Sequence, residues 1–242
     1  CELYLTEKHR DISPILIDFD FRFKVSEDEI ERKYSYEMIK NCISIYISEL
    51  KKFITINDTI NIMLMEKSTP IHDQKKDIIK DGIHIVIPDI VTRKSVQLIV
   101  RTKTLKRIGN ILQAMNCENN VNDIFDEAVI AKNNWQMYGS KKPNSEAYVV
   151  TNHWEYNINE NTFMNKDLID DKEYVEMLSI RNKFVENELT QDNIEEVYKL
   201  DKSLKDNDVK KERKKQLFEK IVQNHETCFT PTTCEELGLV KN

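Results

Sequence analysis

The sequence predicts an α/β domain of the α+β type, because strand-like and helix-like hydrophobic patterns follow one another along it. Apolar and polar residues alternate over residues 14–24, as in a strand with one buried face. Apolar residues recur every three or four positions over residues 36–53 and 92–115, as on the buried stripe of a helix. We therefore expect a sheet with helices packed on it.

Apolar runs with polar boundaries predict the next elements. Residues 60–65 predict a second strand, and residues 82–87 predict a third that ends at Pro88. We expect the lysine-rich stretch 67–81 and the asparagine-rich stretch 116–123 to be loops.

The rest of the chain is more polar. Residues 124–130 predict a short strand or turn, residues 132–146 a polar loop, and residues 147–151 another strand. After about residue 165 the pattern is helical, and residues 190–223 are densely charged, as in an exposed helix.

The composition limits the class of protein. Hydrophobic residues make up 40% of the 242 residues, enough for the core of one large or two small domains. No apolar run approaches the roughly 18 residues of a membrane span, so we expect no membrane association. Five scattered cysteines predict reduced thiols and an intracellular setting. Because residue 1 is Cys1 and not Met, we expect a piece of a longer protein.

The charge distribution is uneven. The formal net charge is −6, which is not typical of a nucleic-acid-binding protein. Between residues 92 and 116, however, the chain carries basic residues and no acid. This predicted helix could follow the phosphates of a DNA template, although a solvated helix face is the more common meaning of such a run.

Residues 15–23, Ile-Leu-Ile-Asp-Phe-Asp-Phe-Arg-Phe, are the most informative stretch. Because successive side chains of a strand point to opposite faces, the phenylalanines share one face, and Asp18, Asp20 and Arg22 share the other. The two aspartates lie about 6.5–7 Å apart at Cα and repel each other unless a cation lies between them. The pattern therefore predicts a site for a hard divalent ion.

Three other polar positions accompany this strand. His84 lies on the face opposite the isoleucines of its predicted strand, where a lone histidine is more often structural than functional. Asp126 follows Ile-Phe, and residues 135–143 read Trp-Gln-Met-Tyr-Gly-Ser-Lys-Lys-Pro.

In this order, Asp-Phe-Asp, Gly-Ile-His, a lone Asp and Tyr-Gly-Ser-Lys-Lys resemble the archaeo-eukaryotic primase superfamily. The likeness is greatest to the primase domains of primase-helicases from large nucleocytoplasmic DNA viruses, and it covers roughly residues 14–155. It implies a primase catalytic core with an RRM-like antiparallel sheet and packed helices. On this basis we expect a catalytic domain over residues 1–160. We expect a charged helical extension or linker over residues 161–242, leading toward a further domain, in this family a helicase.

The resemblance also implies a function: a nucleotidyltransferase that makes primers from NTPs or dNTPs on a single-stranded DNA template, using two Mg²⁺ or Mn²⁺ ions. If the protein is viral, the implied location is the host cytoplasm. Asp18, Asp20 and Asp126 would hold the ions, and His84 would contact the triphosphate. In chemical terms, three carboxylates can hold such a pair of ions.

The same resemblance assigns the phosphate side less sharply. Ser140 and Lys142 match the phosphate-binding element of the family, with Lys141 adjacent and the register open by one position. Arg22 could join this group or simply neutralise the two aspartates of its strand, and we favour neutralisation. The chain departs from the family pattern at Gln136, where some relatives carry Arg.

A second departure is Glu127, which follows Asp126 and could compete for the metal role. Two other functions stay open: a metal-dependent glycosyltransferase that uses Asp-x-Asp, and a catalytically inactive module that binds DNA or partners. Trp135 and Tyr138 could stack on a base or pack in the core.

Near the C-terminus, three possible zinc ligands lie together in the sequence: His225, Cys228 and Cys234. They lack an evident fourth ligand, so we expect no zinc site there.

Overall fold

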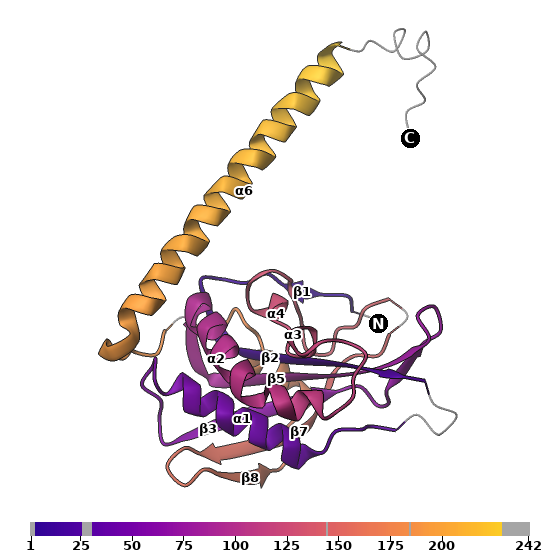
Figure 1. Ribbon diagram of the computed structural model, residues 1–242, viewed down its shortest axis with the longest axis vertical. Coiled ribbons are helices and arrows are strands. Elements are labelled where there is room, and N and C mark those ends of the chain that lie inside the picture. Colours follow the sequence, from indigo (N-terminus) through magenta and orange to yellow (C-terminus); the bar gives the residue numbers. More distant parts are fainter. Residues whose placement is uncertain (1–2, 26–30, 144, 184, 229–242) are drawn as a thin grey trace. The chain divides into compact units, whose positions relative to one another are not determined.

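The computed structural model describes residues 3–25, 31–143, 145–183 and 185–228 (Figure 1). Within these ranges the centre of the fold is a six-stranded sheet, and all of its registered pairs are antiparallel. The strands along the sheet are β2 (Ile12–Lys24), β5 (Ile78–Arg93), β3 (Thr59–Glu66), β7 (Val149–Asn157) and β8 (Thr162–Lys166), with β4 (Ile71–Asp73) paired to the start of β5. The predicted α/β class and antiparallel sheet are confirmed.

Two long helices cover one face of this sheet. They are α1 (Tyr36–Leu50) and α2 (Lys94–Gln113), which pack against each other (Figure 1). The alternation of β2 places Phe19 on this face, where its ring lies 5.1 Å from that of Phe125. The ring of Tyr46 from α1 lies 6.3 Å from Phe125 on the same side. The phenylalanine face of β2 is therefore the face that the helices bury.

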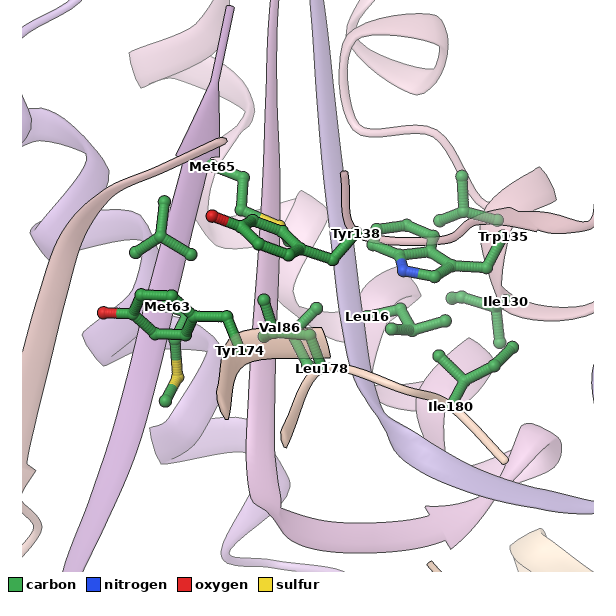
Figure 2. Packing of buried hydrophobic residues seen from close by; sticks show 12 residues of the cluster. Leu16, Met63, Met65, Val86, Ile130, Trp135, Tyr138, Tyr174, Leu178 and Ile180 are labelled. Carbon is green, nitrogen blue, oxygen red and sulfur yellow. The ribbon is translucent and has the colours of Figure 1, made fainter. Parts of the chain in front are cut away.

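The opposite face of the sheet is covered in part by segments that lie later in the chain. Leu16 of β2 and Val86 of β5 are buried there with residues 130, 135 and 138 and with residues of the segment 174–180 (Figure 2). This segment contains α5 (Asp171–Met177), and the short β6 (Trp135–Gln136) pairs with β1 (Thr6–Glu7). The cover stops before it reaches the aspartates of β2, which leaves that end of the face open.

The remaining helical elements are short, except one. They are α3 (Val121–Ile124), α4 (Ala128–Ala131), a 3₁₀ turn (Gln191–Asn193) and α6 (Ile194–Cys228). By its internal contacts the chain divides into two units, residues 1–197 and 198–242. Most of α6 belongs to the second unit, and its described side chains are largely exposed, as the charged sequence predicts.

Several sequence-based boundaries were wrong. Residues 67–81 are not a loop: β4 and the start of β5 form a hairpin whose turn contains Asp77, with φ 51°. β5 does not end at Pro88, because residues 88–90 lie opposite a register shift in β2 between Pro14 and Ile15. At such a bulge a proline removes no ladder hydrogen bond.

The later part of the chain also differs from the prediction. Residues 124–130 hold helical turns, and the strand expected at 147–151 runs on to Asn157 and forms a hairpin with β8. The helical pattern after residue 165 is only partly confirmed, because β8 extends to Lys166 and the described residues between 178 and 190 are not helical.

Candidate active site

A pocket of about 580 Å³ lies over the open end of the sheet, on the face opposite α1 and α2. It brings together residues that are far apart in the sequence. The predicted site residues that line it are Asp18, Asp20, Arg22, His84, Asp126, Ser140 and Lys142. Lys141 does not line it: its backbone N–H donates to the carbonyl of Leu3 at 2.9 Å. Of the two adjacent lysines, Lys142 is therefore the one that faces the pocket.

The first two aspartates owe their position to the register between β2 and β5. Asp18 lies opposite His84, and Asp20 lies opposite Gly82, so all four positions share the pocket face. The Nε2 atom of His84 is 3.8 Å from an Asp18 carboxylate oxygen. Both side chains are only 14% exposed, which places this contact at the floor of the pocket.

Asp126 reaches the same place through the main chain. It lies between α3 and α4, and its backbone N–H donates to the carbonyl of Asp18 at 3.1 Å. Its carboxylate accepts from the N–H of Ala128 at 2.8 Å, which fixes the side chain at the start of α4. Beneath it, the buried guanidinium of Arg101 donates to the carbonyls of Phe125 and Asn122, at 3.0 and 2.8 Å.

Two side-chain amides form hydrogen bonds with the main chain along the outer edge of β2. The amide of Asn119 accepts from the N–H of Arg22 at 3.1 Å and donates to the carbonyl of Asp20 at 2.7 Å. On the same strand, the amide of Gln97 accepts from the N–H of Leu16 at 3.3 Å and donates to the carbonyl of Pro14 at 3.0 Å. Edge groups that would otherwise be unpaired are thus satisfied, which makes the strand carrying the two aspartates rigid.

The negative charges of the three carboxylates repel one another. The pKa of Asp18 is raised to about 8, first because it is buried and then because Asp20 and Asp126 are negative. Arg22 forms an ion pair with Asp20 at 2.6 Å, and it also lines the pocket. As these side chains lie, no group of three His, Cys, Asp or Glu residues in the described ranges is arranged to hold a metal ion.

The chemistry of the donor set nevertheless fits a divalent cation. Three carboxylates of one pocket supply hard oxygen ligands, and a cation among them would remove the repulsion that raises the pKa of Asp18. The residues that would hold it are Asp18, Asp20 and Asp126, with Asp20 exchanging its contact with Arg22 for the ion. Glu127 is engaged elsewhere, since it pairs with Lys132 at 2.8 Å.

His84 is held between two aromatic rings. The ring of Tyr148 stacks on it with centroids 3.7 Å apart, and the ring of Trp135 lies 4.7 Å away. The pKa of His84 is lowered to about 3 by burial and by the nearby Lys142 and Lys67. The imidazole is therefore neutral near pH 7, so it can offer a ligand a hydrogen bond but no positive charge.

The side of the pocket after β6 carries hydroxyl and amine groups. Ser140 is 1% exposed, and its Oγ atom has no hydrogen-bond partner in the described part of the chain. It follows Gly139, whose φ of 73° is adopted most readily by glycine. A buried hydroxyl without a partner is costly unless a ligand completes it.

Sequence reasoning missed two residues of this pocket. In the sequence, Tyr148 looks like an ordinary aromatic residue of a strand. In the structure its hydroxyl lies over Gly82, so a Cβ at Gly82 would collide with it. Lys67 lies just after β3, in the stretch expected to be a loop, and it also lines the pocket. The glycine within Asp-Gly-Ile-His was the one available signal for a close approach of this kind.

Other candidates have structural roles. Trp135 is 2% exposed and packs in the cluster of Figure 2, and Tyr138 donates from its hydroxyl to Asp171 at 2.7 Å. Both therefore pack in the core, and neither is free to stack on a base. The side chains of His225, Cys228 and Cys234 lie outside the described residues. Cys42 and Cys117 are free thiols.

Comparisons with known proteins identify the family of this chain. Residues 1–154 match a family model described as "C962R protein N-terminal AEP domain", where AEP stands for archaeo-eukaryotic primase. The chain is also 33% identical over 152 residues to "Putative helicase L207/L206" of Acanthamoeba polyphaga mimivirus. That match covers 61% of this chain and 15% of the mimivirus protein, so the chain spans only a small part of this relative. No helix in the described ranges has both the length and the apolar character needed to cross a membrane.

Proposed function

The chain belongs to the archaeo-eukaryotic primase family, in the branch of C962R N-terminal domains, and we propose that it synthesises primers on single-stranded DNA from nucleoside triphosphates. The observation that carries this proposal is the meeting of Asp126 with Asp18 and Asp20 in the pocket that also holds His84, Ser140 and Lys142. The family implies primase-type nucleotidyl transfer. The pocket offers separate places for cations and for phosphates.

The acid side would hold two Mg²⁺ or Mn²⁺ ions, with Asp18, Asp20 and Asp126 as the protein ligands. Bound there, such ions would activate the attacking 3′ oxygen and stabilise the charge on the leaving pyrophosphate. Arg22 shields Asp20 while the ligand set is incomplete. Asn119 and Arg101 keep the two carboxylate-bearing segments in register.

The opposite side would hold the triphosphate. Lys142 supplies a positive charge, the buried Ser140 hydroxyl donates a hydrogen bond, and neutral His84 contributes an N–H. Trp135 and Tyr148 keep the imidazole ring in one orientation, so its N–H is directed before the nucleotide binds.

We propose that residues 1–160 are the catalytic domain and that the remainder leads toward a helicase domain in a longer protein. The mimivirus relative, described as a helicase, supports this context. Residues 171–180 nevertheless pack on the primase unit: Glu7 accepts from the hydroxyl of Ser179 and from the N–H of Ile180, at 2.5 and 3.0 Å.

The test is a primer-synthesis assay with single-stranded template, NTPs or dNTPs, and Mg²⁺ or Mn²⁺. We expect new oligonucleotides, and a loss of about two orders of magnitude or more in Asp18→Ala, Asp20→Ala and Asp126→Ala. Asp206→Asn, on the exposed part of α6, is the matched control and should retain activity. Sugar transfer would instead support a glycosyltransferase. DNA binding that these substitutions leave unchanged, without product, would support an inactive binding module.

A further inference from the structure

The charges of the pocket floor are arranged in a row across the sheet. Asp20 on β2 lies opposite Gly82 on β5, and the register between β3 and β5 ends with Glu66 opposite Ile83. Lys67 is the next residue after Glu66, so it leaves β3 at the level of Gly82. Neighbouring strands are about 4.8 Å apart. The Cα atoms of Asp20 and Lys67 are therefore roughly 10 Å apart, with Gly82 between them.

Lys67 is one of two pocket lysines that form no ion pair in the described part of the chain. Three lysines line the pocket: Lys67, Lys80 and Lys142. Lys80 pairs with Asp73 at 2.7 Å. Neither Lys67 nor Lys142 forms an ion pair with a carboxylate within the ranges described. Glu146, the acid that raises the pKa of Lys67 most, instead accepts from the N–H and hydroxyl of Ser68, at 3.1 and 2.6 Å.

The Lys67 side chain is also held in place. Its Nζ atom donates to the hydroxyl of Ser145 at 2.9 Å and lies 5.1 Å from the ring centroid of Tyr148. Burial and the charge of Lys142 lower the pKa of Lys67. Two lysines that repel each other in one pocket are stabilised when a polyanion binds between them.

We propose that Lys67 is a phosphate-binding residue of this pocket and that, with Lys142, it holds the two terminal phosphates of the incoming nucleoside triphosphate. This inference rests on the proposed function. It adds to the phosphate-binding residues one that lies outside the family motifs found in the sequence. The acid side takes the cations, and the lysine side takes the pyrophosphate that leaves. Tyr148, which stacks on His84 and lies under Lys67, links the imidazole to this second cation.

The experiment compares nucleotides that differ only in the number of phosphates. The whole chain is titrated with ATP, ADP and AMP in the presence of Mg²⁺, without template, for the wild type, Lys67→Met, Lys67→Arg and Lys75→Met. Lys75 is an exposed lysine of the β4–β5 hairpin that does not line the pocket, which makes it the matched control.

We expect Lys67→Met to weaken ATP binding about 10- to 100-fold, the range for one hydrogen bond between charged groups, and to leave AMP binding within about twofold. Lys67→Arg should retain most of the ATP affinity, and Lys75→Met should match the wild type. A purely structural role would lower the affinity for all three nucleotides together and would overturn the proposal.

Two further results would also overturn it. One is unchanged ATP affinity in Lys67→Met, in which case the primase function stands and only the role of Lys67 fails. The other is a loss confined to single-stranded DNA, which would assign Lys67 to the template. A wild-type chain that binds none of the nucleotides and makes no primer would remove the proposed function itself.

Discussion

The backbone N–H of Asp126 donates a hydrogen bond to the carbonyl of Asp18, so two acids that lie far apart in the chain are joined directly through the main chain. An isolated bridge between Phe19 and Phe125 aligns the same two segments. The separation of the carboxylates is therefore set by backbone geometry and not by flexible side chains. Whatever fixes the turn that carries Asp126 also fixes the acid side of the pocket.

Arg101 is the residue that fixes this turn. We expect Arg101→Met to lower the free energy of unfolding by about 2–4 kcal/mol, because it leaves the buried carbonyls of Phe125 and Asn122 without their donor. The folded protein should also need more Mg²⁺ or Mn²⁺ for half-maximal primer synthesis, because Asp126 is no longer held against Asp18. Metal titrations on samples of known folded fraction measure this change.

The control for Arg101 is Lys106→Met, an exposed cation on the same helix. It should change neither stability nor the metal requirement. If Arg101→Met lost stability but kept the wild-type metal requirement, Arg101 would have no part in placing Asp126.

Gly82 and Tyr148 make a second prediction, because a Cβ at Gly82 would collide with the tyrosine hydroxyl. Gly82→Ala should lower the free energy of unfolding by about 1–3 kcal/mol and reduce primer synthesis, since the stack on His84 must shift. Tyr148→Phe removes the colliding oxygen, and the next ring atom lies at an ordinary contact distance of 3.6 Å.

The double variant Gly82→Ala with Tyr148→Phe should therefore be more stable than Gly82→Ala alone. A double-mutant cycle from urea unfolding measures this coupling. Additive losses would show that the strain at residue 82 has another source.

Asp81 gives a prediction about pH. It is 3% exposed, one of its carboxylate oxygens has no partner in the described ranges, and burial raises its pKa to about 6. Arg32 at 3.7 Å opposes this shift, and Glu66 adds to it. Because the folded protein holds this proton more tightly than the unfolded chain, the contribution of Asp81 to stability falls as pH rises from about 4 to about 6.

Asp81→Asn does not titrate, so it should be more stable than the wild type at about pH 8, by about 1–3 kcal/mol. The advantage should shrink steadily and disappear near pH 4. Urea unfolding at several pH values tests this, with Asp77→Asn in the exposed hairpin turn as a control. An advantage that is independent of pH would mean that the substitution acts through packing or hydrogen bonds instead.

Strand periodicity predicts the part of the site that lies on the sheet, whereas Asp126, Ser140 and Lys142 were predicted from the family resemblance. Alternation in β2 places Asp18 and Asp20 on the face opposite the phenylalanines, and the pattern around His84 gives its face in the same way. Pairing β2 with β5 in that register then brings His84 opposite Asp18.

The rest depends on contacts that no local pattern encodes. The hairpin at residues 71–80 was missed because β4 has only three residues, too few to show an alternating pattern. The short helices around Asp126 were missed because the segment is held by Arg101 and by the edge of β2, not by its own propensity. The neutral state of His84 follows from burial between Tyr148 and Trp135, which alternation does not reveal.

The basic stretch of α2 leads to the last prediction. Its charges look like a track for DNA phosphates in the sequence, but Arg107 pairs with Glu49 at 2.7 Å and Lys103 pairs with Glu196 at 3.1 Å. Arg101 is buried under Asp126, and Arg93 pairs with Glu186 at 2.6 Å. The helix also packs on the face of the sheet opposite the pocket.

We therefore expect Lys103→Ala with Arg107→Ala to leave the affinity for single-stranded DNA and its salt dependence unchanged. Each residue that contacts a phosphate would contribute about 0.7 to the slope of log K against log salt concentration, and its removal would lower the slope by that amount. Fluorescence anisotropy of a labelled oligonucleotide at several salt concentrations measures the slope. A slope reduced by about 1.4 in the double variant would contradict this prediction. It would mean that α2 binds the template and that DNA contacts both faces of the sheet.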